Sequence, residues 1–204
     1  MEKTFGSGPL TERYDAALKF ASDAHRRQLR KNGNVPYLSH LLRVSGLVLD
    51  YGASEDVAIA ALLHDVVEDC GGLAALEQVR LKFGDVVAEI VLNTSDSTEV
   101  DPQNKAPWRE RKEAYIAKLG NCNDESALVS ACDKLDNITS LLRTITLGGS
   151  DAILSKFKAG RESQIWYFES VLSALKKRRS PVVEELERSL ERLKIVWNSE
   201  RNNK

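Results

Sequence analysis

The sequence contains little cysteine and no long apolar run. Three cysteines in 204 residues leave at least one unpaired and form no closely spaced pair of metal ligands. This favours a reducing compartment over an oxidising one. No apolar stretch approaches the ~18 residues that a membrane span requires, and the first residues lack the apolar core of a signal peptide. We therefore expect a cytoplasmic protein with no membrane partner.

The sequence also lacks an excess of charge of either sign. It has 29 basic and 30 acidic side chains, with a formal net charge of -1, whereas proteins that coat nucleic acids depend on net positive potential. A hydrophobic content of 42% with 29% charged residues is typical of globular proteins. The length fits one domain, so we predict a single domain over residues 1–204 and no nucleic-acid partner. A monomer and a homodimer are both compatible with these features.

No sustained alternation of apolar and polar residues is present, so strands are not predicted. Apolar residues instead recur every three to four positions, which predicts an all-α fold, a single bundle of about eight to ten helices. The polar, aperiodic stretch 94–107 is typical of a functional loop. The predicted helices lie at about 11–29, 39–51, 54–69, 73–82, 84–93, 108–119, 125–147, 150–178 with a break near Gly160, and 181–197.

One predicted helix carries four polar groups that suit metal chemistry. At ~100° per residue, His64, Asp65, Glu68 and Asp69 share one face, and the opposite face is apolar. A solvated face would include Lys or Arg among these acids, and none is present. The carboxylates repel one another unless a cation lies between them. Imidazole and carboxylate together suit Mn, Fe or Zn better than calcium.

This helix offers too few ligands alone, so others must come from elsewhere in the chain. His40 is one candidate, at the start of the predicted helix 39–51. Asp133 is the other, on a polar stripe that it shares with Asn137 and Ser140 at helical spacing. These two residues would complete a site built from three distant segments.

The order of these residues resembles a known superfamily. His40, then His64-Asp65, then Asp133 is similar to the H…HD…D signature of HD-domain metal-dependent phosphohydrolases, which are all-helical. With the segment 30–40, the His64–Asp69 run and the Asp133–Asn137 run, the chain more narrowly resembles the hydrolase domain of RelA/SpoT homologues over about residues 11–150. The resemblance implies a stand-alone small alarmone hydrolase, a (p)ppGpp 3′-pyrophosphohydrolase of the stringent response. Residues 151–204 would be C-terminal helices that complete the fold.

The resemblance also implies a role for individual residues. His40, His64, Asp65 and Asp133 would hold one divalent metal ion, usually Mn²⁺ in this family, and Glu68 and Asp69 would activate water. The substrate contacts implied are Arg30, Lys31, Asn137 and Ser140. Arg109 and Lys112, which open the helix after the polar loop, are further candidates for contact with the pyrophosphate. The chain departs from the family pattern in three places: one extra residue between Gly33 and Pro36, Leu41 in place of proline, and Asp136 where histidine is common.

Two other functions fit the same residues. The metal site could serve another nucleotide, such as ppApp or the 2′-phosphate of NADPH. The pocket could also bind an alarmone without turning it over. The intact Glu68-Asp69 pair favours an enzyme, because binding alone does not need two acids facing phosphate groups. Trp166, Tyr167 and Phe168 are expected mainly to pack in the core.

Overall fold

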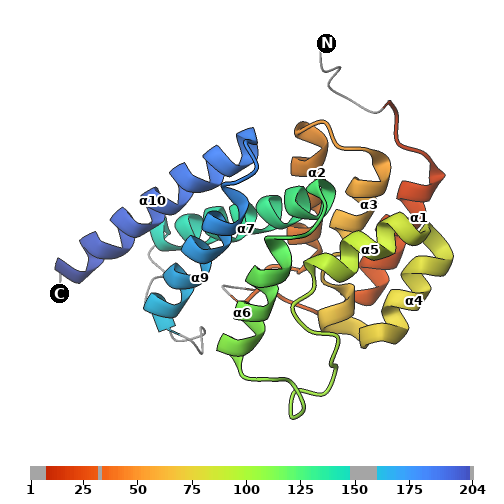
Figure 1. Ribbon diagram of the computed structural model, residues 1–204, viewed down its shortest axis with the longest axis horizontal. Coiled ribbons are helices and arrows are strands. Elements are labelled where there is room, and N and C mark those ends of the chain that lie inside the picture. Colours follow the sequence, from red (N-terminus) through yellow and green to blue (C-terminus); the bar gives the residue numbers. More distant parts are fainter. Residues whose placement is uncertain (1–7, 32–33, 148–159, 203–204) are drawn as a thin grey trace.

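The computed structural model describes residues 8–31, 34–147 and 160–202, and in this part of the chain the fold is entirely helical (Figure 1). The predicted all-α class is thereby confirmed. An isolated antiparallel bridge between Leu29 and Pro36 is the one extended pairing within these ranges. The elements are α1 (Glu12–Ala24), α2 (Leu38–Asp50), α3 (Glu55–Leu63), the π-helix η1 (Val67–Gly71), α4 (Gly72–Phe83), α5 (Asp85–Thr94), α6 (Trp108–Leu119), α7 (Asp124–Thr146), α9 (Gly160–Leu175) and α10 (Pro181–Asn202).

Helix α7 joins the two halves of the molecule. On one side it packs against α2, α3 and α5, and on the other against α9 and α10 (Figure 1). Its length is largely buried, and it is capped at its start by Asn123, whose side chain accepts a hydrogen bond from the Ser126 amide at 2.9 Å. The polar residues that α7 directs inward therefore have a fixed position between the halves.

The first helix is shorter than predicted. It ends at Ala24 rather than near Leu29, because the chain turns at His25 and the Gln28 amide bonds to the His25 carbonyl at 3.0 Å. The Arg30 amide then bonds to the Val35 carbonyl, and the Tyr37 amide to the Gln28 carbonyl, both at 2.9 Å. This turn carries the basic pair of the sequence toward α7 instead of extending it along a helix.

The predicted helix 54–69 is not continuous. Helix α3 ends at Leu63, the chain turns at His64 and Asp65, and the next residues form η1. Contrary to the prediction, the four polar groups therefore do not share the face of one continuous α-helix. The polar groups are instead brought together by a turn followed by a π-helix, an element often found at functional sites.

The polar loop that follows α5 packs on η1. Gly72 has φ +57°, and a Cβ there would lie 2.5 Å from the Thr98 carbonyl oxygen, so the loop approaches more closely than a side chain would allow. The ammonium group of Lys105, on the same loop, donates a hydrogen bond to the main-chain carbonyl of Glu68 at 3.0 Å. The loop thus fixes the segment that carries Glu68 and Asp69.

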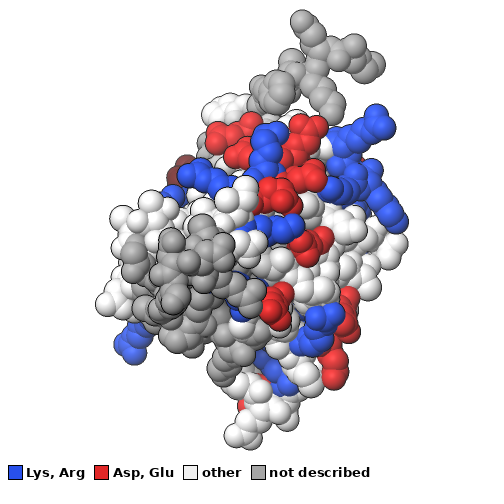
Figure 2. Space-filling view, turned by 90° about the vertical axis from the view of Figure 1, so that its left-hand side faces the viewer, with Lys and Arg blue, Asp and Glu red and all other residues white. Residues whose placement is uncertain are grey.

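The remaining boundaries agree with prediction to within a few residues, and the part of the predicted helix 150–178 that precedes Gly160 lies outside the described residues. None of the helices described is long and apolar enough to cross a bilayer. On the face shown in Figure 2, acidic and basic side chains are interspersed, as the balanced composition leads one to expect.

Candidate metal centre and active site

Four of the predicted residues meet where α2, the end of α3 and α7 come together. The Nε2 atom of His40 lies 3.2 Å from Asp133 Oδ1 and 3.7 Å from Asp65 Oδ2. The Nε2 atom of His64 lies 3.0 Å from Asp65 Oδ2 and 3.8 Å from Asp133 Oδ1. Both imidazoles are buried, at 1% exposure. The structure therefore brings together two nitrogens and two carboxylates from three distant segments.

The hydrogen bonds of the two imidazoles aim both Nε2 atoms at the carboxylates. His64 Nδ1 lies 2.8 Å from the Ala61 carbonyl oxygen, and His40 Nδ1 lies 2.7 Å from Asp136 Oδ2. Each Nδ1 faces an acceptor to which it can donate its proton, so each Nε2 would be free to bind a metal ion placed between the carboxylates. The buried His64 Nε2 has no hydrogen-bond partner among the described residues.

Four ligand atoms that face one another favour a cation between them. Burial by itself would lower the pKa of His64, but the charges of Asp65 and Asp133 outweigh burial and raise it. The site thus attracts positive charge. His40, His64 and Asp65 offer ligand atoms that lie within 4.8 Å of one another, and Asp133 is close enough to join them. Two imidazoles and two carboxylates are a donor set that suits a divalent transition metal.

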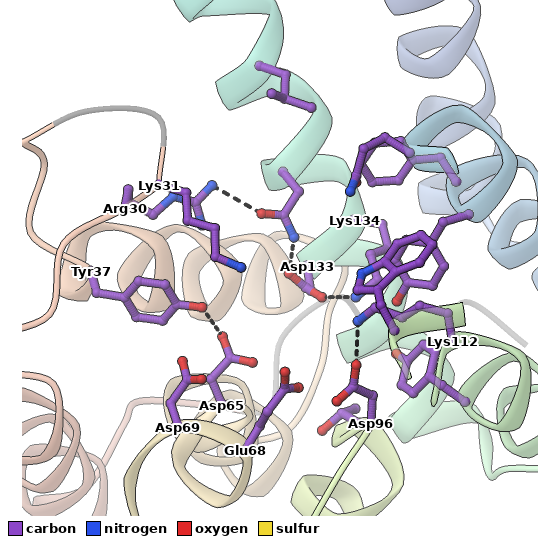
Figure 3. Close-up of a pocket in the computed structure, with 18 of the residues that line it drawn as sticks. Arg30, Lys31, Tyr37, Asp65, Glu68, Asp69, Asp96, Lys112, Asp133 and Lys134 are labelled. Carbon is purple, nitrogen blue, oxygen red and sulfur yellow. Dashed lines mark hydrogen bonds and ion pairs between the residues drawn. The ribbon is translucent and has the colours of Figure 1, made fainter. Parts of the chain in front are cut away.

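The two acids on η1, Glu68 and Asp69, lie next to Asp65 (Figure 3). Burial, reinforced by the charge of Asp96, raises the pKa of Glu68 to about 7. Burial and the nearby Asp65 also raise the pKa of Asp69, although the Gln28 amide donates to its carboxylate at 2.7 Å. Glu68 therefore has a pKa close to neutral pH, which is the range suited to a general base.

A cavity of about 260 Å³ opens over these acids. Figure 3 shows Arg30 and Lys31 on one side of it and Lys112 and Lys134 on the other, with Asp65, Glu68 and Asp69 lying below. The residues that line it come from the 28–37 turn, the turn between α3 and η1, η1, the end of α5, the polar loop, α6, α7 and α9. Among the described residues, the cavity is lined by Gln28, Leu29, Arg30, Lys31, Tyr37, Asp65, Glu68, Asp69, Thr94, Asp96, Trp108, Lys112, Tyr115, Asp133, Lys134, Asn137, Leu141, Gln164, Tyr167 and Phe168.

The predicted substrate contacts divide into two groups. Arg30, Lys31, Lys112 and Asn137 line the cavity, and the Arg30 guanidinium donates to Asn137 Oδ1 at 3.1 Å. Arg109 and Ser140 are not among the lining residues. Arg109 pairs with Glu113 at 2.7 Å and lies 3.2 Å from the centre of the Trp166 ring, and Ser140 is buried on α7.

The sequence did not single out several groups that shape this cavity. The Tyr37 hydroxyl donates to Asp65 Oδ2 at 2.6 Å. Lys134 pairs with Asp133 and lies 5.2 Å from the centre of the Tyr115 ring. Tyr167, expected mainly in the core, is buried but also lines the cavity. Lys134 directly follows the predicted ligand Asp133, and this position in the sequence was the one indication that it belongs to the site.

Asp96 is the other group that sequence reasoning missed. Its side chain is 3% exposed and pairs with Arg111 at 2.6 Å and Lys112 at 2.5 Å. Arg111 also lies 3.9 Å from Glu68. Asp96 thus holds two cations of α6 next to the acid with the raised pKa.

Replacing Asp96 with alanine is expected to lower the free energy of unfolding by about 3–5 kcal/mol, because two cations lose the carboxylate that compensates them in a buried setting. The matched control is Asp85→Ala, which removes an acid that pairs with Arg80 at 2.5 Å but is 85% exposed and should cost less than about 1 kcal/mol. Urea unfolding of both variants measures the difference. Equal losses would show that Asp96 does not stabilise the site.

Comparison with known proteins agrees with this geometry. The family model described as HD domain matches residues 17–147. The guanosine-3′,5′-bis(diphosphate) 3′-pyrophosphohydrolase MESH1 of Drosophila melanogaster is 35% identical over 127 residues, which are 61% of this chain and 66% of that protein. The guanosine-3′,5′-bis(diphosphate) 3′-pyrophosphohydrolase of Aquifex aeolicus is 30% identical over 143 residues, 69% of this chain and 20% of that protein. The chain thus spans about two thirds of the first relative and a fifth of the second.

Solved structures show the same similarity. A metazoan orthologue of SpoT, a protein that hydrolyses ppGpp and plays a role in starvation responses, superposes with a TM-score of 0.75 at 25% identity. The match covers 91% of this chain and 98% of that one. A crystal structure of a Listeria monocytogenes protein gives a TM-score of 0.63 at 30% identity and covers 78% of this chain and 97% of that one. These matches confirm the resemblance that the motifs predicted.

Proposed function

Because the chain belongs to the HD-domain family, we propose that it is a Mn²⁺-dependent hydrolase that removes pyrophosphate from the 3′ position of ppGpp or pppGpp. The products are GDP or GTP and pyrophosphate. The observation that carries the proposal is the convergence of His40, His64, Asp65 and Asp133 beside Glu68, at the floor of a cavity flanked by basic side chains. The relatives that hydrolyse this substrate support it.

His40 and His64, through Nε2, and Asp65 and Asp133, through a carboxylate oxygen each, would hold the ion. His64 Nε2, which has no hydrogen-bond partner in the part of the chain that the structure describes, and the two carboxylates that face it fit a cation in this place. A bound divalent ion neutralises phosphate charge and lowers the pKa of a water molecule. Tyr37 keeps Asp65 oriented through its hydroxyl. The ligands are therefore fixed before substrate arrives.

Glu68 would accept the proton of the attacking water. Its carboxylate must be ionised to do so, and a pKa of about 7 keeps a large fraction ionised at neutral pH while making it a stronger base than an ordinary glutamate. Asp69, held by Gln28, lies on the same π-helix and would assist in handling protons. The leaving group is the ribose 3′-oxygen, which takes a proton as the bond to phosphorus breaks.

The charge of the cavity also fits a polyphosphate substrate that binds with a metal ion. Among the described lining residues, five carboxylates outnumber four basic side chains by one. Without a cation the lining has no net positive charge, and with a divalent ion its balance turns positive. Arg30 would pair with phosphate by bidentate hydrogen bonds and Lys31 and Lys112 as point charges.

The raised pKa of Glu68 has a consequence for stability. A carboxyl whose pKa is 4.5 in the unfolded chain and about 7 in the folded protein binds its proton more tightly when folded, so it favours folding at low pH and costs stability as the pH rises through this window. The substitution Glu68→Gln removes this cost. It should therefore raise the free energy of unfolding of the metal-free protein by about 1–3 kcal/mol more at pH 8 than at pH 5. Urea unfolding at the two pH values tests this, and an equal effect at both would contradict a raised pKa.

Two alternative functions are distinguished by product analysis. The purified protein is incubated with Mn²⁺ and with ppGpp, ppApp, NADPH or GDP, and the products are separated. Release of pyrophosphate from ppGpp supports the proposal. Preference for ppApp, or release of phosphate from NADPH, would identify another nucleotide substrate of the same site. Tight binding of ppGpp without any product would identify an alarmone-binding module.

Two wider features belong to the proposal. Residues 11–150 would form the catalytic core, and the C-terminal helices would complete the same domain, since α10 packs along α7 and α9 supplies Gln164, Tyr167 and Phe168 to the cavity. The three free cysteines suit a reducing compartment, which supports a cytoplasmic location.

A further inference from the structure

Asp136 lies behind the metal centre and not in the cavity. It is 4% exposed and is not among the lining residues. Its Oδ2 atom lies 2.7 Å from His40 Nδ1, and the Arg43 guanidinium donates to both of its oxygens, from Nη2 at 3.2 Å and from Nε. Arg30 Nη2 lies 3.6 Å from the same Oδ2. One buried carboxylate therefore contacts a candidate metal ligand and a candidate substrate residue.

The two histidines of the centre differ in this respect. His64 Nδ1 faces a neutral acceptor, the Ala61 carbonyl, whereas His40 Nδ1 faces the charged carboxylate of Asp136. A carboxylate acceptor holds the imidazole proton on Nδ1 more firmly and increases the electron density at Nε2, which makes that nitrogen a stronger metal ligand. His40 thus has a charged side-chain acceptor behind it, whereas His64 has only a backbone carbonyl.

The environment makes a buried charge at this position stable. Arg43 and Arg30 flank Asp136, so the carboxylate is compensated, and a buried charge without such partners would be costly. Arg43 contacts both carboxylate oxygens, and Oδ2 is shared with Arg30 and His40. The arrangement is that of a carboxylate–imidazole pair anchored on α7.

We propose that Asp136 is a positioning residue that fixes His40 in its metal-binding tautomer and so increases the affinity of the centre for its divalent ion. The same carboxylate holds Arg30 in place. This inference rests on the metal site of the proposed function. In the family that the sequence resembles, histidine is common at the position of Asp136. The proposed role of this aspartate is therefore particular to this chain.

The test compares Asp136→Asn, Asp136→Ala and a control, Glu125→Gln, which removes an exposed acid from the same helix α7. Mn²⁺ affinity is measured by electron paramagnetic resonance. Loss of a group that supports a metal ligand typically weakens binding by about 10- to 100-fold, and we expect this for Asp136→Asn and at least as much for Asp136→Ala. The control should bind as the wild type does.

A second readout needs no metal. In the metal-free protein, ¹⁵N NMR of the imidazole reports which nitrogen of His40 carries the proton. We expect the proton on Nδ1 in the wild type and in Asp136→Asn, which keeps an oxygen acceptor, and a mixture of tautomers in Asp136→Ala. A residue that merely packed in the core would not change this signal. The asparagine variant still reports on metal affinity if the alanine variant fails to fold.

The outcomes separate this inference from the proposed function. Wild-type affinity in a folded Asp136→Asn variant, or an unchanged tautomer in Asp136→Ala, would overturn the role of Asp136 and leave the hydrolase intact. Absence of Mn²⁺ binding in the wild type would overturn the proposed metal site and this inference with it. Weaker binding in Asp136→Asn together with mixed tautomers in Asp136→Ala supports it.

Discussion

Replacing Glu68 with glutamine is expected to abolish measurable release of pyrophosphate while Mn²⁺ affinity stays at the wild-type value. Glutamine has nearly the same shape but cannot accept a proton, and general-base catalysis contributes typically ~10²–10⁴-fold to the rate. Glu68 lies next to the candidate ligand Asp65 (Figure 3) but is not in the group of residues able to hold a metal ion. Steady-state kinetics with ppGpp and a parallel Mn²⁺ titration measure both quantities.

The control for this variant is Glu110→Gln, which removes an exposed glutamate from α6. It should retain full activity. An active Glu68→Gln enzyme would remove Glu68 from the reaction. An inactive variant that has also lost Mn²⁺ would instead place Glu68 among the ligands.

Replacing His64 with alanine is expected to eliminate both Mn²⁺ binding and activity. The deletion removes one of two nitrogen donors and leaves Asp65 and Asp133 without the group between them. In the wild type, a ligand at 100 times its Kd raises the free energy of unfolding by about 2.7 kcal/mol. We expect that increase with Mn²⁺ in the wild type and none in the variant.

Wild type and variant are compared by the increase in the free energy of unfolding that Mn²⁺ causes. Their absolute stabilities differ in any case, because truncation of a buried side chain opens a cavity. The control is His25→Gln. His25 is the third histidine of the chain and is buried against the Tyr37 ring, outside the candidate ligand set. Its variant should be less stable but should keep the Mn²⁺-dependent increase. If His64→Ala kept that increase too, the ion would bind elsewhere.

The helical fold could be predicted from sequence because apolar spacing is a local signal. Thr11 and Asn123 begin helices in the structure and have side chains suited to capping. The interruption after Leu63 could not be predicted, because the apolar pattern continues through Val66 and Val67. What shapes η1 is the polar loop that packs on Gly72 and bonds to the Glu68 carbonyl, and this is a tertiary contact.

The candidate site shows the same division. Histidine and aspartate at characteristic separations could be identified by residue type, and the structure brings them together. Asp96 could not, because in the sequence it is an acid in a polar loop, as Asp101 is. In the structure Asp96 is buried between two cations, whereas Asp101 is exposed. Arg109 and Lys112 likewise open the same helix, yet only Lys112 lines the cavity among the described residues.

We expect a metal ion held by His40, His64, Asp65 and Asp133 to support attack of water on the 3′ phosphorus of ppGpp. The most direct measurement is hydrolysis of ppGpp in ¹⁸O-labelled water, with Mn²⁺ present or removed by a chelator. We predict pyrophosphate that carries one ¹⁸O, GDP that carries none, and no product after chelation. Label in GDP, inorganic phosphate as the released product, or unchanged turnover with the chelator would contradict it.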